Sequence, residues 1–286
     1  MVVEFNEDQK ELLKIYRELL TYGYEKISKV PLNLSKSRVR KKILYFMMGA
    51  MQSYSESILK LMGSLPVYEK PGESLLRSQL ELWLNMRFIY SSRTEDKARL
   101  FLSDLIIDSN TYAKRHKSLW NKYPKWNLVF GKIKNAAEWD KFISDNNKIL
   151  EKNQNKHHDK KVNKLPNLYD KTLVIDKYLK KIGKLSEKTS AEKFYILFYP
   201  YFSQAVHLSM PGLQRFIKNN NLEDKKTSFQ IDSKPEEAER VLIISFIAYF
   251  ATLHLFLQVF NMYDKNEYDK FKKFSKNISK GKTISK

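Results

Sequence analysis

The chain has 286 residues with only 8 glycines and 8 prolines, too few turn-forming residues for a β-sandwich or a β-barrel. Lys and Arg outnumber Asp and Glu by 52 to 32, and the net charge of +20 favours polyanions such as RNA or an anionic membrane surface. A lysine-rich composition that only keeps the protein soluble is the competing interpretation. The chain contains no cysteine, which excludes disulfides and thiolate metal ligands. Together with the acidic start MVVEFNEDQK, which does not have the pattern of a signal peptide, this favours a cytoplasmic protein.

Apolar residues spaced by three and four predict helices through most of the chain. In chain order we expect them at about 6–28, 36–63, 73–92, 94–119, from 135, 167–182, 189–209 and 234–264. Two prolines and a glycine in SLPVYEKPGES separate the second helix from the third, and Gly183 ends the sixth. Thr189 and Glu192 have the spacing of a capping box at the start of the seventh.

These elements predict an all-α fold, a single bundle of about seven to eight helices over residues 1–264 with a central apolar helix. The polar run at about 145–166 is predicted to be an insertion without fixed structure, and the basic end at 265–286 a flexible tail. The apolar stretch at 241–263 is long enough to cross a bilayer. Polar residues interrupt it, so we favour a buried core helix over a membrane anchor.

The predicted third helix carries one polar stripe, formed by Arg77, Glu81 and Asn85 at steps of four. Its other faces are apolar, and a charged pair placed there must be paired and hydrogen-bonded because its desolvation is costly. Two interpretations follow. Arg77 and Glu81 form a clamp that orients neighbouring helices, or Arg77 binds an anion while Glu81 orients it or acts as a base; in this second interpretation Asn85 is a further binding residue.

A second polar pattern lies in FYPYFSQAVHLSMPG, where Tyr199, Ser203 and His207 fall at i, i+4 and i+8 on one helical face. Pro200 lies inside this pattern and predicts a kink. If His207 faces Arg77, the two helices form a polar centre with one group that titrates near neutral pH.

The segment 112–142 mixes basic residues with aromatic ones, as surfaces that bind single-stranded nucleic acids do. Its candidate binding residues are Lys114, Arg115, Trp120 and Trp126. The alternative is that the tryptophans pack inward. We expect no metal site, because His157 and His158 have no second ligand cluster, and no cofactor, because no phosphate-binding or dinucleotide-binding motif occurs. A homo-oligomer that buries the apolar helices is an open possibility.

The segments LLRSQLELWLNMRFIY and YFSQAVHLS, followed by a long apolar closing helix, resemble an uncharacterised family of bacterial all-helical proteins. The resemblance covers about 35–110 and 190–262. Its helical layout is loosely similar to HEPN domains, many of which are ribonucleases of defence and toxin systems. HEPN nucleases carry an Arg followed four to six residues later by a His on one helix, and this sequence lacks such a pair.

The sequence therefore leaves three functions open. The first is a nucleic-acid-directed protein of a bacterial defence or toxin system, either an RNA-binding protein or a metal-independent RNase. In the RNase, His207 would act as general acid and base and Arg77 would stabilise phosphate charge, with Glu81 and Ser203 as further catalytic residues. The second is a non-enzymatic helical scaffold, and the third a membrane-associated protein. We favour the first.

Overall fold

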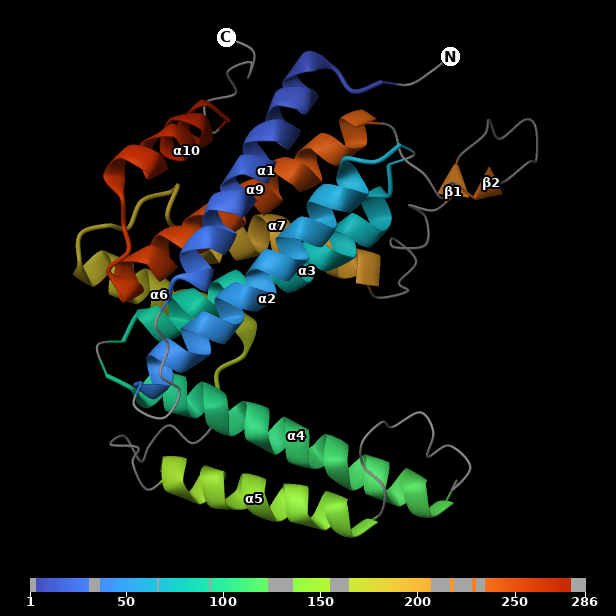
Figure 1. Ribbon diagram of the computed structural model, residues 1–286, viewed down its shortest axis with the longest axis vertical. Helices are drawn as coiled ribbons and strands as arrows, with labels where there is room; N and C mark the ends of the chain where they lie inside the picture. Colours follow the sequence, from blue (N-terminus) through green and yellow to red (C-terminus); the bar gives the residue numbers. More distant parts are fainter. Residues whose placement is uncertain are drawn as a thin grey trace. The chain divides into compact units, whose positions relative to one another are not determined.

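The computed structural model describes residues 4–30, 37–65, 67–92, 94–122, 136–154, 165–206, 217–218, 228–229 and 235–278. The predicted all-α class is confirmed: within these residues the chain forms nine helices and one two-residue antiparallel strand pair (Figure 1). The helices are α1 Glu7–Ser28, α2 Val39–Met62, α3 Glu69–Tyr90, α4 Asp96–Lys122, α5 Ala136–Gln154, α6 Leu168–Lys181, α7 Ala191–Val206, α9 Pro235–Phe260 and α10 Lys265–Ile278. The strands are β1 Ile217–Lys218 and β2 Ser228–Phe229.

The helices group into two compact units. The large unit comprises Met1–Ser37, Leu44–Ser91 and Leu168–Lys286, and so contains α1, α3, α6, α7, α9, α10 and most of α2. The hairpin unit comprises Arg38–Ile43 and Ser92–Asn167, in which α4 and α5 pack against each other.

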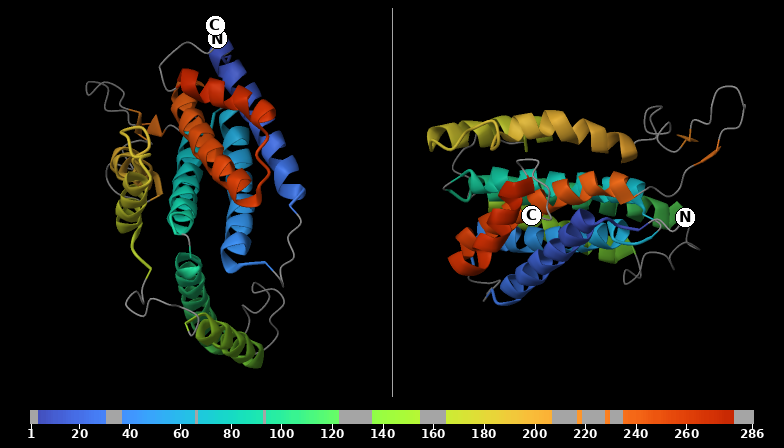
Figure 2. Two further views of the ribbon diagram at one scale, coloured as in Figure 1. Left: turned by 90° about the vertical axis from the view of Figure 1, so that its left-hand side faces the viewer. Right: turned by 90° about the horizontal axis from the view of Figure 1, so that it is seen from above.

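The core of the large unit forms around α9, which contacts α1, α3 and α10. Its fully buried side chains include Phe246, Tyr249, Leu253 and Phe256, as predicted for a central apolar helix. Within the described residues, Ala238–Phe260 is long and apolar enough to cross a membrane, and 67% of its most apolar window is buried inside the protein. That burial is typical of a core helix. A layer of α6 and α7 covers the neighbouring face of α3 (Figure 2).

A hydrogen-bonded network of polar side chains crosses this core. Tyr16 on α1 contacts Ser245 on α9 at 2.5 Å between the hydroxyl oxygens. Gln79 Nε2 on α3 donates to Ser55 Oγ on α2 at 2.7 Å and to the Ser245 carbonyl at 3.2 Å. The network therefore joins four helices in one register, because any slip would leave buried polar atoms unpaired.

Local side-chain contacts set the ends of several helices. Asn6 caps α1 in a capping box with Gln9, and Gly183 follows α6 with a φ of 66° that favours glycine. At α7 the predicted Thr189 box is wrong. Ser190 Oγ accepts from the Lys193 amide instead, and Asp176 on α6 accepts from the amides of residues 191 and 192.

Three other boundaries differ from the sequence expectation. The third helix begins at Glu69, because Pro71 lies in its first turn, where no intrahelical donor is needed. The run expected to lack fixed structure is helical as far as Gln154, where α5 ends, and residues 155–164 lie outside the described residues. The expected flexible tail contains α10, which buries its aromatic face of Tyr268, Phe271 and Phe274.

Candidate functional site

Five polar side chains follow one another at steps of four along α3: Glu69, Glu73, Arg77, Glu81 and Asn85. This spacing places them in one continuous row that winds gradually around the helix, here called the α3 polar row. Each of the five side chains is hydrogen-bonded to a side chain of another helix, as the following contacts show.

The middle of the row is a three-residue cluster with Tyr199 of α7. Arg77 Nε donates to Glu81 Oε1 at 3.0 Å, and an Arg77 guanidinium nitrogen lies 3.2 Å from the Tyr199 hydroxyl. The Tyr199 hydroxyl donates to the same Glu81 oxygen at 2.6 Å. The cluster is partly open to solvent, because the Arg77 and Glu81 side chains are 18% and 37% exposed.

The chemistry open to this cluster is hydrogen-bond donation and charge stabilisation. Burial, followed by the hydrogen bond to Glu81, raises the pKa of Tyr199, so its hydroxyl stays protonated at neutral pH. Tyr195 stacks on Tyr199 with ring centres 4.7 Å apart, and burial raises its pKa also. Arg77 and Tyr199 both donate to Glu81, so the cation and the single hydroxyl proton are already paired within the cluster.

Of the expected catalytic residues Ser203 and His207, only Ser203 lies among the described residues. Ser203 lies in α7 one turn after Tyr199, on the same face, and is half-buried. α7 continues through Pro200 to Val206. His207 lies outside the described residues, so the expected acid–base partner of Arg77 stays a prediction.

Asn85, expected to bind a ligand, is engaged by a lysine of the neighbouring helix. Lys171 of α6 is 6% exposed, and its Nζ donates to Asn85 Oδ1 at 2.8 Å. The same ammonium lies 5.9 Å from the centre of the Phe88 ring. The Asn85 amide therefore stabilises a buried cation.

The acidic start of the row escaped the sequence analysis. Glu69 and Glu73 are buried, and Arg240 of α9 donates to both carboxylates at 3.2 Å and 3.0 Å. Arg240 also contacts the Tyr201 hydroxyl of α7, and Lys70 donates to Glu69 at 2.9 Å. The same step of four, continued back from Arg77, reaches Glu73 and Glu69. The Pro-Gly pair at 71–72 instead predicted a loop there, so these two residues were not placed on the helix.

The basic candidate surface lies in the hairpin unit. This unit holds 21 Lys and Arg against 9 Asp and Glu in 82 residues, so it carries +12 of the net charge of +20. Lys114 and Arg115 are exposed on α4 beside Tyr112, whose side chain is 56% exposed. Trp126 and the side chain of Trp120 lie outside the described residues.

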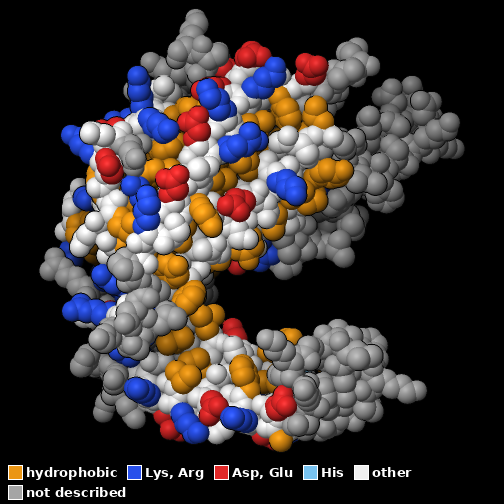
Figure 3. Space-filling view, viewed as in Figure 1, with side chains coloured by type: hydrophobic (Ala, Val, Ile, Leu, Met, Phe, Trp, Pro, Cys, Tyr) orange, Lys and Arg blue, Asp and Glu red, His pale blue; other side chains and the backbone are white. Residues whose placement is uncertain are grey.

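The aromatic residues of the hairpin unit divide into packed and exposed ones. Trp139 of α5 is buried and stacks on His116 of α4 with ring centres 5.7 Å apart, so for Trp139 the inward-packing alternative holds. Tyr112 also contacts His116, with ring centres 3.9 Å apart, and its side chain remains exposed. Basic and acidic side chains are interspersed among the coloured residues of both units in Figure 3.

Among the described residues, no group of three or more His, Cys, Asp or Glu side chains is placed to hold a metal ion. In comparison with known proteins, residues 41–226, about two thirds of the chain, match a family of unknown function (DUF5677). This match confirms the expected uncharacterised family and leaves the similarity to HEPN domains a prediction. No curated protein and no solved structure matches the chain.

Proposed function

Because the chain belongs to the DUF5677 family, whose function is unknown, we propose its function from its own surfaces: it binds single-stranded RNA through the hairpin unit. One observation carries this proposal. More than half of the net positive charge lies in that unit, where exposed cations adjoin an exposed aromatic ring.

The electrostatic part of the proposal rests on α4. Lys114, Arg115 and Lys122 are exposed there, and within the described part of the chain neither Lys114 nor Arg115 forms an ion pair. Lys117 differs, because Asp140 of α5 accepts from its ammonium at 2.6 Å. Contacts between such cations and phosphates release counterions, so binding weakens steeply with salt.

The aromatic part rests on Tyr112. A base that stacks on an exposed ring gains about 1–3 kcal/mol, and stacking of this kind is open to unpaired bases. Arg115 lies three residues after Tyr112 and so neighbours it on one face of α4, where one strand of nucleic acid can contact the ring and this cation together. A duplex keeps its bases stacked and offers only the charge contribution, which favours single-stranded RNA as the ligand.

A second candidate function is the non-enzymatic scaffold, and a specific observation favours it. Glu81 already accepts hydrogen bonds from Arg77 and Tyr199, while Asn85 and Glu73 hold cations from two other helices. Contacts of this kind fix helix positions. RNA cleavage at Arg77 and the setting of a defence or toxin system stay predictions.

Fluorescence anisotropy with a labelled single-stranded RNA tests the RNA-binding proposal. We expect Lys114→Glu combined with Arg115→Glu to weaken binding by more than about tenfold and to reduce the salt slope by about 1.4, since each phosphate contact contributes about 0.7. The matched control is Lys188→Glu with Lys272→Glu, two exposed lysines of the large unit. Equal losses in both double variants, or no binding by the unmodified protein, would contradict the proposal.

A further inference from the structure

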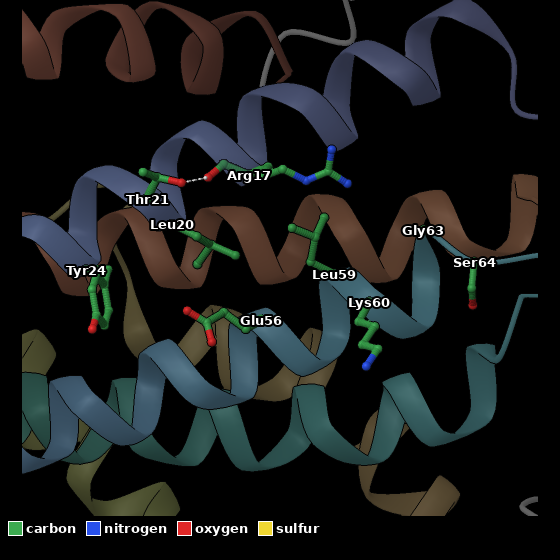
Figure 4. Close-up of a pocket in the computed structure, with 9 residues that line it drawn as sticks. All are labelled: Arg17, Leu20, Thr21, Tyr24, Glu56, Leu59, Lys60, Gly63 and Ser64. Atoms are coloured by element: carbon green, nitrogen blue, oxygen red, sulfur yellow. Dashed lines mark hydrogen bonds between the residues drawn. The ribbon is translucent and has the colours of Figure 1, made fainter.

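An open groove of about 640 Å³ lies between α1 and α2 in the large unit (Figure 4). It is separate from the α3 polar row and from the hairpin unit. Its lining residues are Arg17, Leu20, Thr21, Tyr24, Glu56, Leu59, Lys60, Gly63 and Ser64. The two helices run antiparallel here, because Gln52 of α2 reaches the carbonyl of Leu20 whereas Gly63 lies close to Leu13. Arg17 and Lys60 therefore line one end of the groove, and Tyr24 and Glu56 the other.

The first end of the groove is cationic. Arg17 and Lys60 are exposed, and neither side chain has an ion-pair partner among the residues that the structure describes. The arginines of the α3 polar row and its surroundings behave differently, since Arg77 and Arg240 each bind carboxylates. Two unmatched cations on facing helices form a site with the charge and donors that a phosphate requires.

The second end combines an oriented carboxylate with an aromatic ring. Glu56 Oε1 accepts from Gln52 Nε2 at 2.7 Å. Gln52 is itself fixed, because it is 6% exposed, donates to the Leu20 carbonyl at 3.0 Å and accepts from the Tyr249 hydroxyl. Glu56 Oε2 has no partner within the described part of the chain and remains an acceptor beside the 62% exposed Tyr24 ring.

The floor between the two ends is apolar, formed by Leu20 and Leu59. Arg17 and Tyr24 are seven residues apart on α1, which corresponds to about 10 Å along the helix axis. A ligand that satisfies both ends has an anionic group at one end, a flat ring with a hydrogen-bond donor at the other, and a less polar connection. The groove volume lies within the range of about 300–1,000 Å³ that is common for small-molecule sites.

We propose that this groove binds a nucleoside monophosphate whose base carries an amino group, such as AMP. Arg17 and Lys60 bind the phosphate, the base stacks on Tyr24, and its exocyclic amino group donates to Glu56 Oε2. The ribose lies over Leu20 and Leu59. The same chemistry occurs at the phosphorylated end of an RNA strand, so the experiment has to distinguish the two sources.

Isothermal titration of the full chain with AMP tests the proposal. We expect saturable binding that Arg17→Ala and Lys60→Ala each weaken by about tenfold, the effect of one charge-assisted hydrogen bond. Lys14→Ala, an exposed residue of α1 outside the groove, is the matched control and should bind AMP like the unmodified protein. Adenosine and inorganic phosphate each satisfy one end only and should bind more weakly than AMP.

The source of the nucleotide is decided by a short RNA with a 5′-phosphate, measured beside AMP in the variant Lys114→Glu with Arg115→Glu. Retained AMP binding in that variant supports the groove even if the hairpin unit binds no RNA. Tighter binding of the RNA end than of AMP in the same variant assigns the groove to strand ends. Absence of AMP binding, equal binding of inorganic phosphate and AMP, or equal losses in Arg17→Ala and Lys14→Ala would overturn the proposal.

Discussion

Replacement of Gly23 by alanine tests how closely α1 approaches α9. A Cβ atom at Gly23 would overlap the Tyr249 hydroxyl and lie 2.9 Å from Tyr249 Cζ and 3.3 Å from Gln52 Oε1. Tyr249 is fully buried, and its hydroxyl donates to Gln52. The ring has no space to retreat into without a shift of α9, so Gly23→Ala breaks this hydrogen bond or displaces the helix.

The expected cost combines two contributions. Overpacking of a buried site costs about 1–3 kcal/mol, and a buried polar group left without its partner costs about another 1–3 kcal/mol. The better helix propensity of alanine returns about 1 kcal/mol. We therefore expect Gly23→Ala to lower the free energy of unfolding by about 1–5 kcal/mol.

Gly49 of α2 provides the matched control. It is helical and exposed, and a Cβ there would meet no atom within 4 Å, so Gly49→Ala should raise the free energy of unfolding by about 0.5–1 kcal/mol. Urea denaturation of both variants measures the difference. Tyr249→Phe should restore only part of the stability lost in Gly23→Ala, because the contact with Cζ persists. Equal stabilities of Gly23→Ala and Gly49→Ala would refute the packing described here.

Three further predictions concern other parts of the chain. Tyr199→Phe removes the donor to Glu81 and should lower the free energy of unfolding by about 1 kcal/mol in urea, and an unchanged value would argue against a clamp. Phe271→Ala removes a buried ring of α10 and should lower the free energy of unfolding by about 3–4 kcal/mol. Lys272→Ala, at an exposed neighbour, should change it by less than about 0.5 kcal/mol. Equal effects of the two substitutions would contradict the docking of α10. Burial lowers the pKa of Lys97 from 10.5 to about 8, so between pH 8 and pH 10 the unfolded chain binds more protons at this site. Stability relative to Lys97→Met should therefore rise with pH across that window, and a constant difference in urea titrations would contradict this burial.

The sequence predicted the helices well where an apolar stripe had a clear start and end. Gly183 marked the end of α6 because the physics of helix ends is local. α10 was missed because its lysines outweigh its apolar content, although Tyr268, Phe271 and Phe274 are spaced by three. Its burial depends on a face of the large unit that a local pattern does not reveal.

The candidate site was predictable only in part. Steps of four identified Arg77 and Glu81, and Tyr199 was singled out on a separate helix. The contact between Arg77 and Tyr199 depends on how α3 packs on α7, across 122 positions of sequence, so no local pattern could establish it. The hairpin unit was not recognised for a related reason. α4 and α5 are joined by contacts between residues far apart in the sequence, such as the hydrogen bond between Asn110 and Asn147.

The central claim is that the hairpin unit carries the RNA-binding surface. Ultraviolet crosslinking of the full chain to a single-stranded RNA, followed by mass spectrometry of the crosslinked peptides, tests it most directly. The account predicts crosslinks within α4, centred on Tyr112 and the adjacent cations, that disappear in the variant Lys114→Glu with Arg115→Glu. Crosslinks confined to the large unit, or crosslinks that persist unchanged in that variant, would contradict it.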